Sequence, residues 1–221
     1  MRTTWIPVWL AAALVLGCED SAVDEPQEIA DEMQEDIEED HGLAAPAGEG
    51  MQQRATVPSA LADVDVLMAA LQPTRGSQAR GTVRFSTSGE DVKVSAEVEG
   101  LEPGSKHGFH VHEYGDCSAE DGMSAGGHYA PEDHPHALPP TTPRHAGDMG
   151  NLEADDEGRA TYEGSLADVS LVGPRNPLVG RAVIVHAGED TGEQPSGAAG
   201  PRLACGVVGI AEGEGSGAGD E

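Results

Sequence analysis

Hydrophobic and polar residues alternate in short runs along the middle of the chain. In the run 92–98, Val or Ala at every even position alternates with Lys93, Ser95 and Glu97. The run 82–86 alternates likewise, with Val83 and Phe85 on one side. Alternation with a period of two is typical of half-buried β-strands. Because the turn-forming sequence 88–91 separates the two runs, they predict a β-hairpin.

Further short apolar runs are bounded by Gly, Pro and Asp, and they predict strands at 63–69, 108–112, 158–162, 181–186 and 206–210. The composition of 61–71 also permits a helix. About seven short strands predict an all-β, antiparallel fold, either a β-sandwich or a flattened barrel. The polar stretches 113–148 and 187–202 are too long for ordinary hairpins, so we expect two functional loops there.

The charge of the chain is strongly negative and unevenly placed. Residues 19–50 contain thirteen Asp and Glu but no Lys or Arg, which leaves too little apolar surface to offset the entropy of ordering. We expect a disordered acidic tether at 19–55, one folded domain at 56–211 and a disordered tail at 212–221. The net charge of −28, with lysine only at Lys93 and Lys106, excludes a typical nucleic-acid-binding protein.

The N-terminus has the pattern of an export signal. Arg2 is followed by an apolar run, 5–16, that is too short to cross a bilayer comfortably. The run ends in Val15-Leu16-Gly17-Cys18, which resembles a bacterial lipobox, so we expect residues 1–18 to be a signal peptide and Cys18 to be lipidated. A plain cleaved signal and an uncleaved anchor are the alternatives. All three interpretations place the protein outside the cytosol, in the cell envelope or periplasm. Lipidation of Cys18 would anchor it to a membrane there.

The two other cysteines are Cys117 and Cys205. They form an even pair in a compartment that permits disulfides. A bridge between them is the expectation, and two buried thiols are the alternative.

Histidines concentrate in the region of the predicted strands. His110 and His112 flank Val111 on a strand, so both imidazoles point to one face, while Phe109 and Val111 point into the core. His186 ends a later strand, and the first long polar stretch contributes His128, His134, His136, His145 and Asp148. Imidazole suits copper and zinc, and a carboxylate suits a tetrahedral zinc site. A lone His-x-His pair is most often incidental, but this larger set predicts two metal sites.

Five motifs together resemble the copper,zinc superoxide dismutase family across about 63–211. They are Gly108-Phe109-His110-Val111-His112-Glu113, Gly126-Gly127-His128-Tyr129, His145-Ala146-Gly147-Asp148, Val185-His186, and the run 202–209, RLACGVVG. The resemblance implies a Greek-key β-sandwich and an enzyme that converts superoxide anion to oxygen and hydrogen peroxide. The position of Cys117, five residues after His112, resembles the bacterial branch of the family.

The resemblance also implies the role of each site residue. Copper would be held by His110, His112, His128 and His186, and zinc by His128, His136, His145 and Asp148. His128 would bridge the metals and carry a proton, and Arg202 would dock the superoxide anion. Asp190 would link a copper ligand to a zinc ligand, and Cys117 and Cys205 would form the family disulfide. His134 competes with His136 for zinc, whereas His107 and His41 match no site and are expected to be exposed.

Two other functions remain compatible with the pattern. One is a metal-binding or copper-storage lipoprotein that is not catalytic, and the other is a structural or adhesion protein of the envelope, which leaves the histidine spacing unexplained. Both a monomer and a homodimer are compatible with the sequence. The loop 187–201 contains Glu189, Asp190 and Glu193 but no lysine, so we expect Arg202 to supply nearly all of the positive guidance for the anion.

Overall fold

The computed structural model describes residue 61 and residues 63–212. The predicted signal peptide with Cys18, the predicted acidic tether at 19–55, His41 and nearly all of the predicted C-terminal tail lie outside the described residues. Eight antiparallel strands follow one another along the chain: β1 (Val66–Pro73), β2 (Arg80–Ser88), β3 (Asp91–Glu99), β4 (Lys106–His112), β5 (Asp148–Glu153), β6 (Ala160–Leu166), β7 (Ala182–His186) and β8 (Arg202–Ile210).

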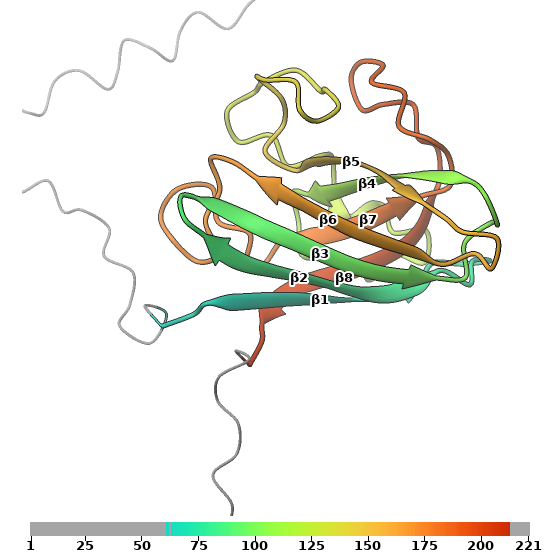
Figure 1. Cartoon of the computed structure of the whole chain (residues 1–221), viewed down its shortest axis with the longest axis horizontal. Coiled ribbons are helices and arrows are strands. Elements are labelled where there is room, and N and C mark those ends of the chain that lie inside the picture. Colours follow the sequence, from blue (N-terminus) through green and yellow to red (C-terminus); the bar gives the residue numbers. More distant parts are fainter. Residues whose placement is uncertain (1–60, 62, 213–221) are drawn as a thin grey trace, which may run out of the picture. The chain divides into compact units, whose positions relative to one another are not determined.

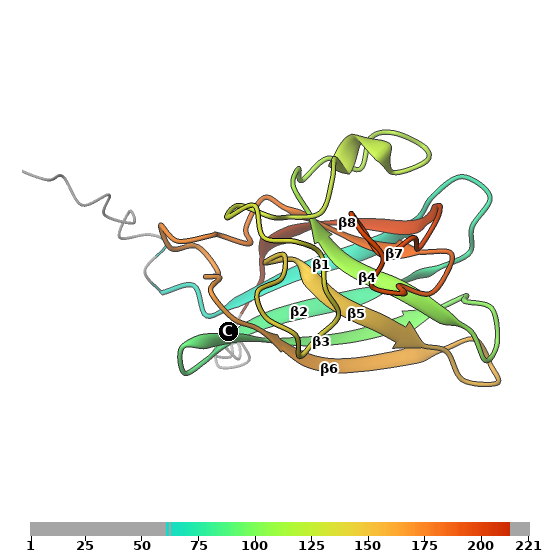
Figure 2. The same cartoon turned by 90° about the horizontal axis from the view of Figure 1, so that it is seen from above.

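The strands are hydrogen-bonded in the order β5-β4-β7-β8-β1-β2-β3-β6. Figures 1 and 2 show that this sheet folds over itself, so that β6, β3, β2 and β1 face β5, β4, β7 and β8 across the core. The two ends of the sheet meet where the Tyr162 hydroxyl of β6 donates a hydrogen bond of 2.8 Å to the Met149 carbonyl of β5. The predicted all-β antiparallel sandwich or flattened barrel is therefore confirmed.

Alternation explains how each strand supplies the core. In β3, Val92, Val94, Ala96 and Val98 are buried while Lys93 and Glu97 are exposed. Phe85 of β2 and Phe109 of β4 are fully buried on the facing layers. Burying a side chain of this size contributes about 1.5–3 kcal/mol relative to leaving it in water. The predicted hairpin is present, with β2 and β3 paired from Arg80–Glu99 to Ser88–Asp91.

Some boundaries differ from the sequence prediction. Strand β1 runs later, from Val66 to Pro73, so the helical alternative for 61–71 is wrong. Strand β6 begins at Ala160, because Gly158 has a positive φ of 73° and belongs to the preceding turn. Strand β5 was not predicted at all. Its first three residues are buried in succession, so the run Asp148–Glu153 lacks the alternation on which the prediction depended.

The two long polar stretches are loops that follow β4 and β7, the strands that contain His110, His112 and His186. The first, 113–147, joins β4 to β5 and contains the short 3₁₀ helix η2 (Met123–Ala125), and the second, 187–201, joins β7 to β8. The predicted disulfide is present and ties Cys117 of the first loop to Cys205 of β8. Closing a loop of 88 residues contributes roughly 4.6 kcal/mol in the chain-entropy model. Among the described residues, no helix is long and apolar enough to cross a membrane.

Candidate metal centre

Strands β4 and β7 present three of the histidines. Phe109 and Val111 of β4 belong to the hydrophobic core, and the alternation places His110 and His112 on the opposite side of the strand. Strand β7 pairs with β4, and its last residue, His186, lies beside them. The His186 and His112 Nε2 atoms are 3.4 Å apart. All three side chains are buried.

The first long loop brings His128 to the same place. Its backbone forms an isolated β-bridge with His112, and the Tyr129 N–H donates a hydrogen bond of 2.9 Å to the Val111 carbonyl. The loop therefore adds a short strand-like segment to the end of β4. The His128 ring lies against His110, with ring centroids 4.0 Å apart. Its two nitrogens face two different groups of side chains.

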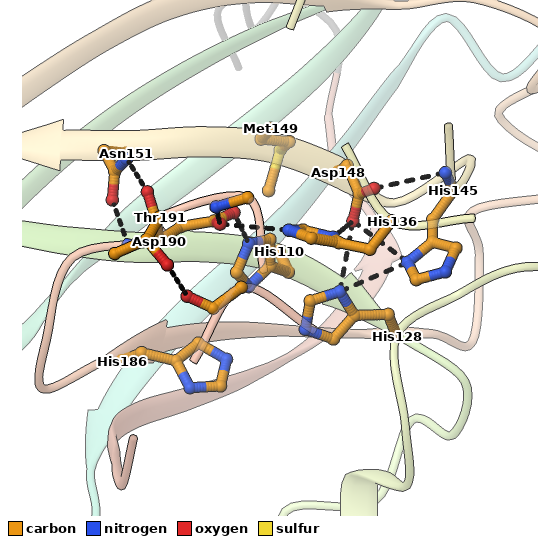
Figure 3. A network of polar contacts seen from close by, with 12 residues as sticks. His110, His128, His136, His145, Asp148, Met149, Asn151, His186, Asp190 and Thr191 are labelled. Atoms are coloured by element: carbon orange, nitrogen blue, oxygen red, sulfur yellow. Dashed lines mark hydrogen bonds and ion pairs between the residues drawn. The ribbon is translucent and has the colours of Figure 1, made fainter. Parts of the chain in front are cut away.

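On one side of His128, three imidazole nitrogens surround a single carboxylate oxygen (Figure 3). Asp148 Oδ1 lies 3.1 Å from His128 Nδ1, 3.0 Å from His136 Nδ1 and 3.2 Å from His145 Nδ1. The other oxygen of Asp148 accepts hydrogen bonds of 3.1 Å from the backbone N–H groups of Ala137 and His145. The carboxylate is thus fixed by the backbone, while Oδ1 points at the histidines.

On the other side, each histidine has one nitrogen engaged and the other directed into the cluster. The His112 Nδ1–H donates to the Gly126 carbonyl at 3.0 Å, and the His186 Nδ1–H donates to the Gly200 carbonyl at 3.1 Å. The His110 Nε2–H donates to Asp190 Oδ2 at 2.8 Å. Such bonds fix the tautomer and the orientation of each ring. They leave His112 Nε2, His186 Nε2 and His110 Nδ1 free to bind a cation.

Asp190 connects the two groups of histidines. Its Oδ2 accepts from His110, and its Oδ1 accepts a hydrogen bond of 2.9 Å from His136 Nε2. Asn151 of β5 holds the Asp190 backbone with two bonds, donating to its carbonyl at 2.9 Å and accepting from its N–H at 2.7 Å. The sequence did not identify Asn151, because a single amide in an unpredicted strand carries no spacing signal.

Two glycines allow the loop 187–201 to cover this bridge. A Cβ on Gly197 would lie 2.1 Å from Asp190 Oδ1 and 2.9 Å from His136 Nε2. A Cβ on Gly108 would lie 2.7 Å from the Ala199 Cβ and 3.0 Å from His110 Cε1. Real Cβ atoms do not approach other atoms so closely, so only glycine fits the packing of the backbone against the Asp190 bridge at these two positions.

Burial and the carboxylates determine the protonation of the cluster. Burial lowers the pKa of His110 to about 4, that of His186 to about 3, and that of His112 well below its ordinary value. These rings are therefore neutral at pH 7, as metal ligands must be. Burial opposes protonation of His136, but the adjacent carboxylates of Asp148 and Asp190 outweigh burial and raise the pKa of His136 to about 9.

Arg202 lies at the start of β8, beside the His112 and His186 side of the cluster. Its two terminal nitrogens donate hydrogen bonds of 2.6 Å to the carbonyls of Gly122 and Gly126. The Gly126 carbonyl thus accepts from both Arg202 and His112. Burial lowers the pKa of Arg202, and the Coulombic attraction of Asp121 opposes that shift. A guanidinium stays charged under these conditions and attracts anions.

Two histidines behave differently from the main cluster. His134 is 41% exposed, and its Nε2 lies 3.9 Å from Glu132, outside the group formed around Asp148. His107 was expected to be exposed, and this is wrong. It is buried, with Nδ1 donating to the His186 carbonyl at 2.8 Å and Nε2 lying 2.6 Å from the Ser105 hydroxyl. Strand alternation places residue 107 on the core side together with Phe109 and Val111.

The arrangement fits two metal ions that share one ligand. The atoms of His110, His112, His128 and His186 lie within 4.8 Å of one another, and so do those of His128, His136, His145 and Asp148. Three buried nitrogens, His110 Nδ1, His128 Nε2 and His136 Nδ1, have no hydrogen-bond partner. A tetrahedral zinc with bonds of about 2.0–2.1 Å separates its ligand atoms by about 3.3 Å. The contacts around Asp148 Oδ1 span 3.0–3.2 Å, so the donor set matches that ion.

An antiparallel β-sandwich with a largely buried cluster of six histidines and two aspartates is the scaffold of a two-metal protein. Comparison with known proteins identifies the family to which this two-metal protein belongs. The family model for copper/zinc superoxide dismutase matches residues 79–208. The chain therefore belongs to the copper/zinc superoxide dismutase family.

Individual relatives agree with the family match. The chain is 43% identical over 139 residues to copper/zinc superoxide dismutase 2 of Brassica juncea, covering 59% of this chain and 90% of that protein. It is also 43% identical over 141 residues to the copper/zinc superoxide dismutase of Saccharomyces cerevisiae, covering 59% and 89%. The enzyme of a Chlorella virus is 41% identical over 141 residues, covering 60% and 74%. The predicted family, the enzyme class, the activity and the cofactors, copper and zinc, are confirmed.

Proposed function

We propose that this chain disproportionates superoxide at a centre in which His110, His112, His128 and His186 hold copper and His128, His136, His145 and Asp148 hold zinc. The observation that carries this assignment is the position of His128. Its Nδ1 faces the Asp148 group, and its Nε2 faces the other histidines without a hydrogen-bond partner. A deprotonated imidazole in that position can bind one cation through each nitrogen.

Copper, when bound, supplies the one-electron cycle between Cu(II) and Cu(I) that oxidises one superoxide to oxygen and reduces a second to hydrogen peroxide. The second half of the reaction consumes two protons. His128 Nε2 is the atom of this chain that is placed to hold one of them, because it is buried and uncommitted. Asp148 keeps the ring in place through Nδ1, at 3.1 Å.

Arg202 is proposed to bind the superoxide anion beside the copper ligands. Its backbone-bound guanidinium is held rigidly by two carbonyls, at 2.6 Å each. A guanidinium held this way can offer a charge-assisted hydrogen bond without first losing side-chain freedom. Asp190 is proposed to hold His110 and His136 so that neither ring turns during the cycle.

The assignment of the two ligand sets is tested by metal analysis. The purified wild-type protein is expected to bind one copper and one zinc per chain after exposure to both ions. A His145→Ala variant is expected to lose zinc and keep copper, because His145 contacts only the Asp148 group and His128. A variant that keeps stoichiometric zinc, or loses both metals equally, contradicts the assignment.

We also propose that the protein is exported and lipid-anchored through Cys18, in the manner of bacterial envelope lipoproteins. The apolar run 5–16 and the lipobox-like sequence ending at Cys18 support this, and the acidic segment after Cys18 would act as a tether. The test is expression in a bacterium supplied with a labelled fatty acid. The wild type is expected to carry the label and Cys18→Ser is not. The variant is also expected to disappear from the membrane fraction. Equal labelling would contradict the anchor.

For the oligomeric state, which the sequence leaves open between a monomer and a homodimer, we propose a homodimer. Val207 and Ile210 of β8 and Tyr114 of the first loop are exposed apolar side chains, at 44%, 55% and 58%. Aromatic side chains such as Tyr114 are enriched at protein–protein interfaces. Sedimentation equilibrium of the processed protein is expected to give twice the mass of one chain, and a monomer mass at micromolar concentration would contradict this.

A further inference from the structure

Gln194 and His136 pair through two hydrogen bonds, although they lie in different loops. The Gln194 Nε2–H donates to the His136 carbonyl at 2.7 Å, and the His136 N–H donates to Gln194 Oε1 at 3.2 Å. The orientation of the amide is fixed, because the carbonyl needs a donor and the N–H needs an acceptor. Gln194 itself is on the surface, in the loop 187–201, whereas His136 is buried.

This pairing takes the place of a neighbouring strand. The His128 backbone is bridged to His112, and Asp148 begins strand β5, but His136 lies in an irregular part of the first loop. In an antiparallel ladder, a hydrogen-bonded residue pair exchanges both N–H···O bonds. The side-chain amide of Gln194 has the same donor and acceptor as a peptide group, so it gives His136 the pairing that its own loop does not provide.

The same loop also holds the His136 ring. Asp190 Oδ1 accepts from His136 Nε2 at 2.9 Å, so Asp190 fixes the ring while Gln194, four residues later, fixes the backbone. The Thr191 N–H donates to the Gly197 carbonyl at 2.9 Å, and the Gly197 N–H donates to the Glu193 carbonyl at 2.6 Å. These bonds close the segment 191–197, which includes Gln194, into a compact turn.

We propose that Gln194 is a positioning residue for the metal centre, which fastens the loop 187–201 to the backbone of His136 and so holds this ligand in the zinc group. This inference rests on the proposed zinc ligands. It predicts an effect on zinc retention that is larger than any effect on copper, because His136 belongs to the group around Asp148 and not to the group of His110, His112, His128 and His186. Residues that orient metal ligands typically change metal affinity by about 10–100-fold when they are removed.

Three variants of the full-length protein test the proposal: Gln194→Ala, Gln194→Glu, and Gln78→Ala as a control on an exposed glutamine in the β1–β2 connection. Gln194→Ala removes both bonds. Gln194→Glu keeps the acceptor for the His136 N–H but places a carboxylate oxygen where the donor stood, 2.7 Å from the carbonyl. Zinc release to a chelator is measured, together with copper release. Co²⁺ loaded in place of zinc reports the ligand geometry through its visible absorption.

Both Gln194 variants are expected to release zinc about tenfold faster than wild type and to shift the Co²⁺ absorption, with Gln194→Glu no better than Gln194→Ala. Copper release, the thermal unfolding midpoint of the metal-free protein, and the Gln78→Ala variant are expected to stay at wild-type values. Zinc release at the wild-type rate, or an unchanged Co²⁺ spectrum, would overturn the proposal. A lowered metal-free midpoint with equal loss of both metals would also overturn it. Failure of the wild type to bind zinc would instead refute the proposed ligand set.

Discussion

Asp190 and His136 are joined by a buried hydrogen bond of 2.9 Å, and the second oxygen of the same carboxylate accepts from His110 at 2.8 Å. One side chain thus holds a ring from each half of the histidine cluster. Hydrogen bonds from both rings overcome the effect of burial and lower the pKa of Asp190. The carboxylate is therefore ionised throughout the neutral range, and both rings keep their free nitrogens toward the cluster.

Replacing Asp190 with Ala is expected to weaken zinc binding by about 10–100-fold, because His136 and His110 lose the acceptor that orients them. Competition with a chelator of known affinity measures the change. Glu189→Gln is the matched control, since the neighbouring Glu189 makes only an exposed contact of 3.5 Å with Lys106. An Asp190→Ala protein that binds zinc as tightly as wild type would show that the bridge does not position the ligands.

Replacing Arg202 with Ala is expected to lower superoxide turnover about 10–100-fold while copper and zinc content stay at wild-type values. The estimate corresponds to a hydrogen bond to a charged group, about 1.5–3 kcal/mol. Stopped-flow decay of superoxide and metal analysis of the same samples check it. Arg202→Lys keeps the charge but not the fork of two donors, so its turnover is expected to lie between those of the wild type and Arg202→Ala. Unchanged turnover in Arg202→Ala would remove this residue from anion binding.

Salt is expected to have little effect on the rate. Both lysines of the chain are paired with carboxylates: Lys93 with Glu163 at 2.8 Å, and Lys106 with Glu153 at 3.3 Å and with Glu189 at 3.5 Å. Glu189 and Glu193 lie in the loop beside Arg202, so the surrounding field attracts the anion weakly or repels it. Raising the ionic strength about tenfold is expected to change the second-order rate less than about twofold or to increase it slightly. A steep decrease would indicate attractive steering.

His134 and His136 form a test pair, because they lie two residues apart in the same loop. His136→Ala is expected to lose zinc, since its Nδ1 lies 3.0 Å from Asp148 Oδ1 in the buried group. His134→Ala is expected to keep it, since His134 is 41% exposed beside Glu132. Metal analysis after dialysis distinguishes the two. If His134→Ala lost zinc and His136→Ala kept it, His134 and not His136 would be the zinc ligand.

The sequence predicted most of the sheet and the composition of the cluster, for physical reasons that particular residues make clear. Strand β3 alternates because one face meets water, and His110 and His112 follow from the same period. Strand β5 could not be recognised, because both faces of Asp148–Asn151 are covered. The burial of His107 could have been predicted from alternation along β4. The roles of Asn151 and Gln194 could not have been predicted. Each side-chain amide bonds to the backbone of a residue distant in sequence, and only the folded loops bring the two partners together.

The consumption of superoxide by the full-length protein loaded with copper and zinc, measured beside a His128→Ala variant, tests the central claim most directly. The account predicts rapid second-order turnover in the wild type. It predicts loss of at least about 100-fold in the variant, because the ring between the two groups and its uncommitted Nε2 are both removed. Full metal occupancy without turnover in the wild type, or undiminished turnover in His128→Ala, would contradict it. The first of these results would favour a metal-binding protein built on the same scaffold.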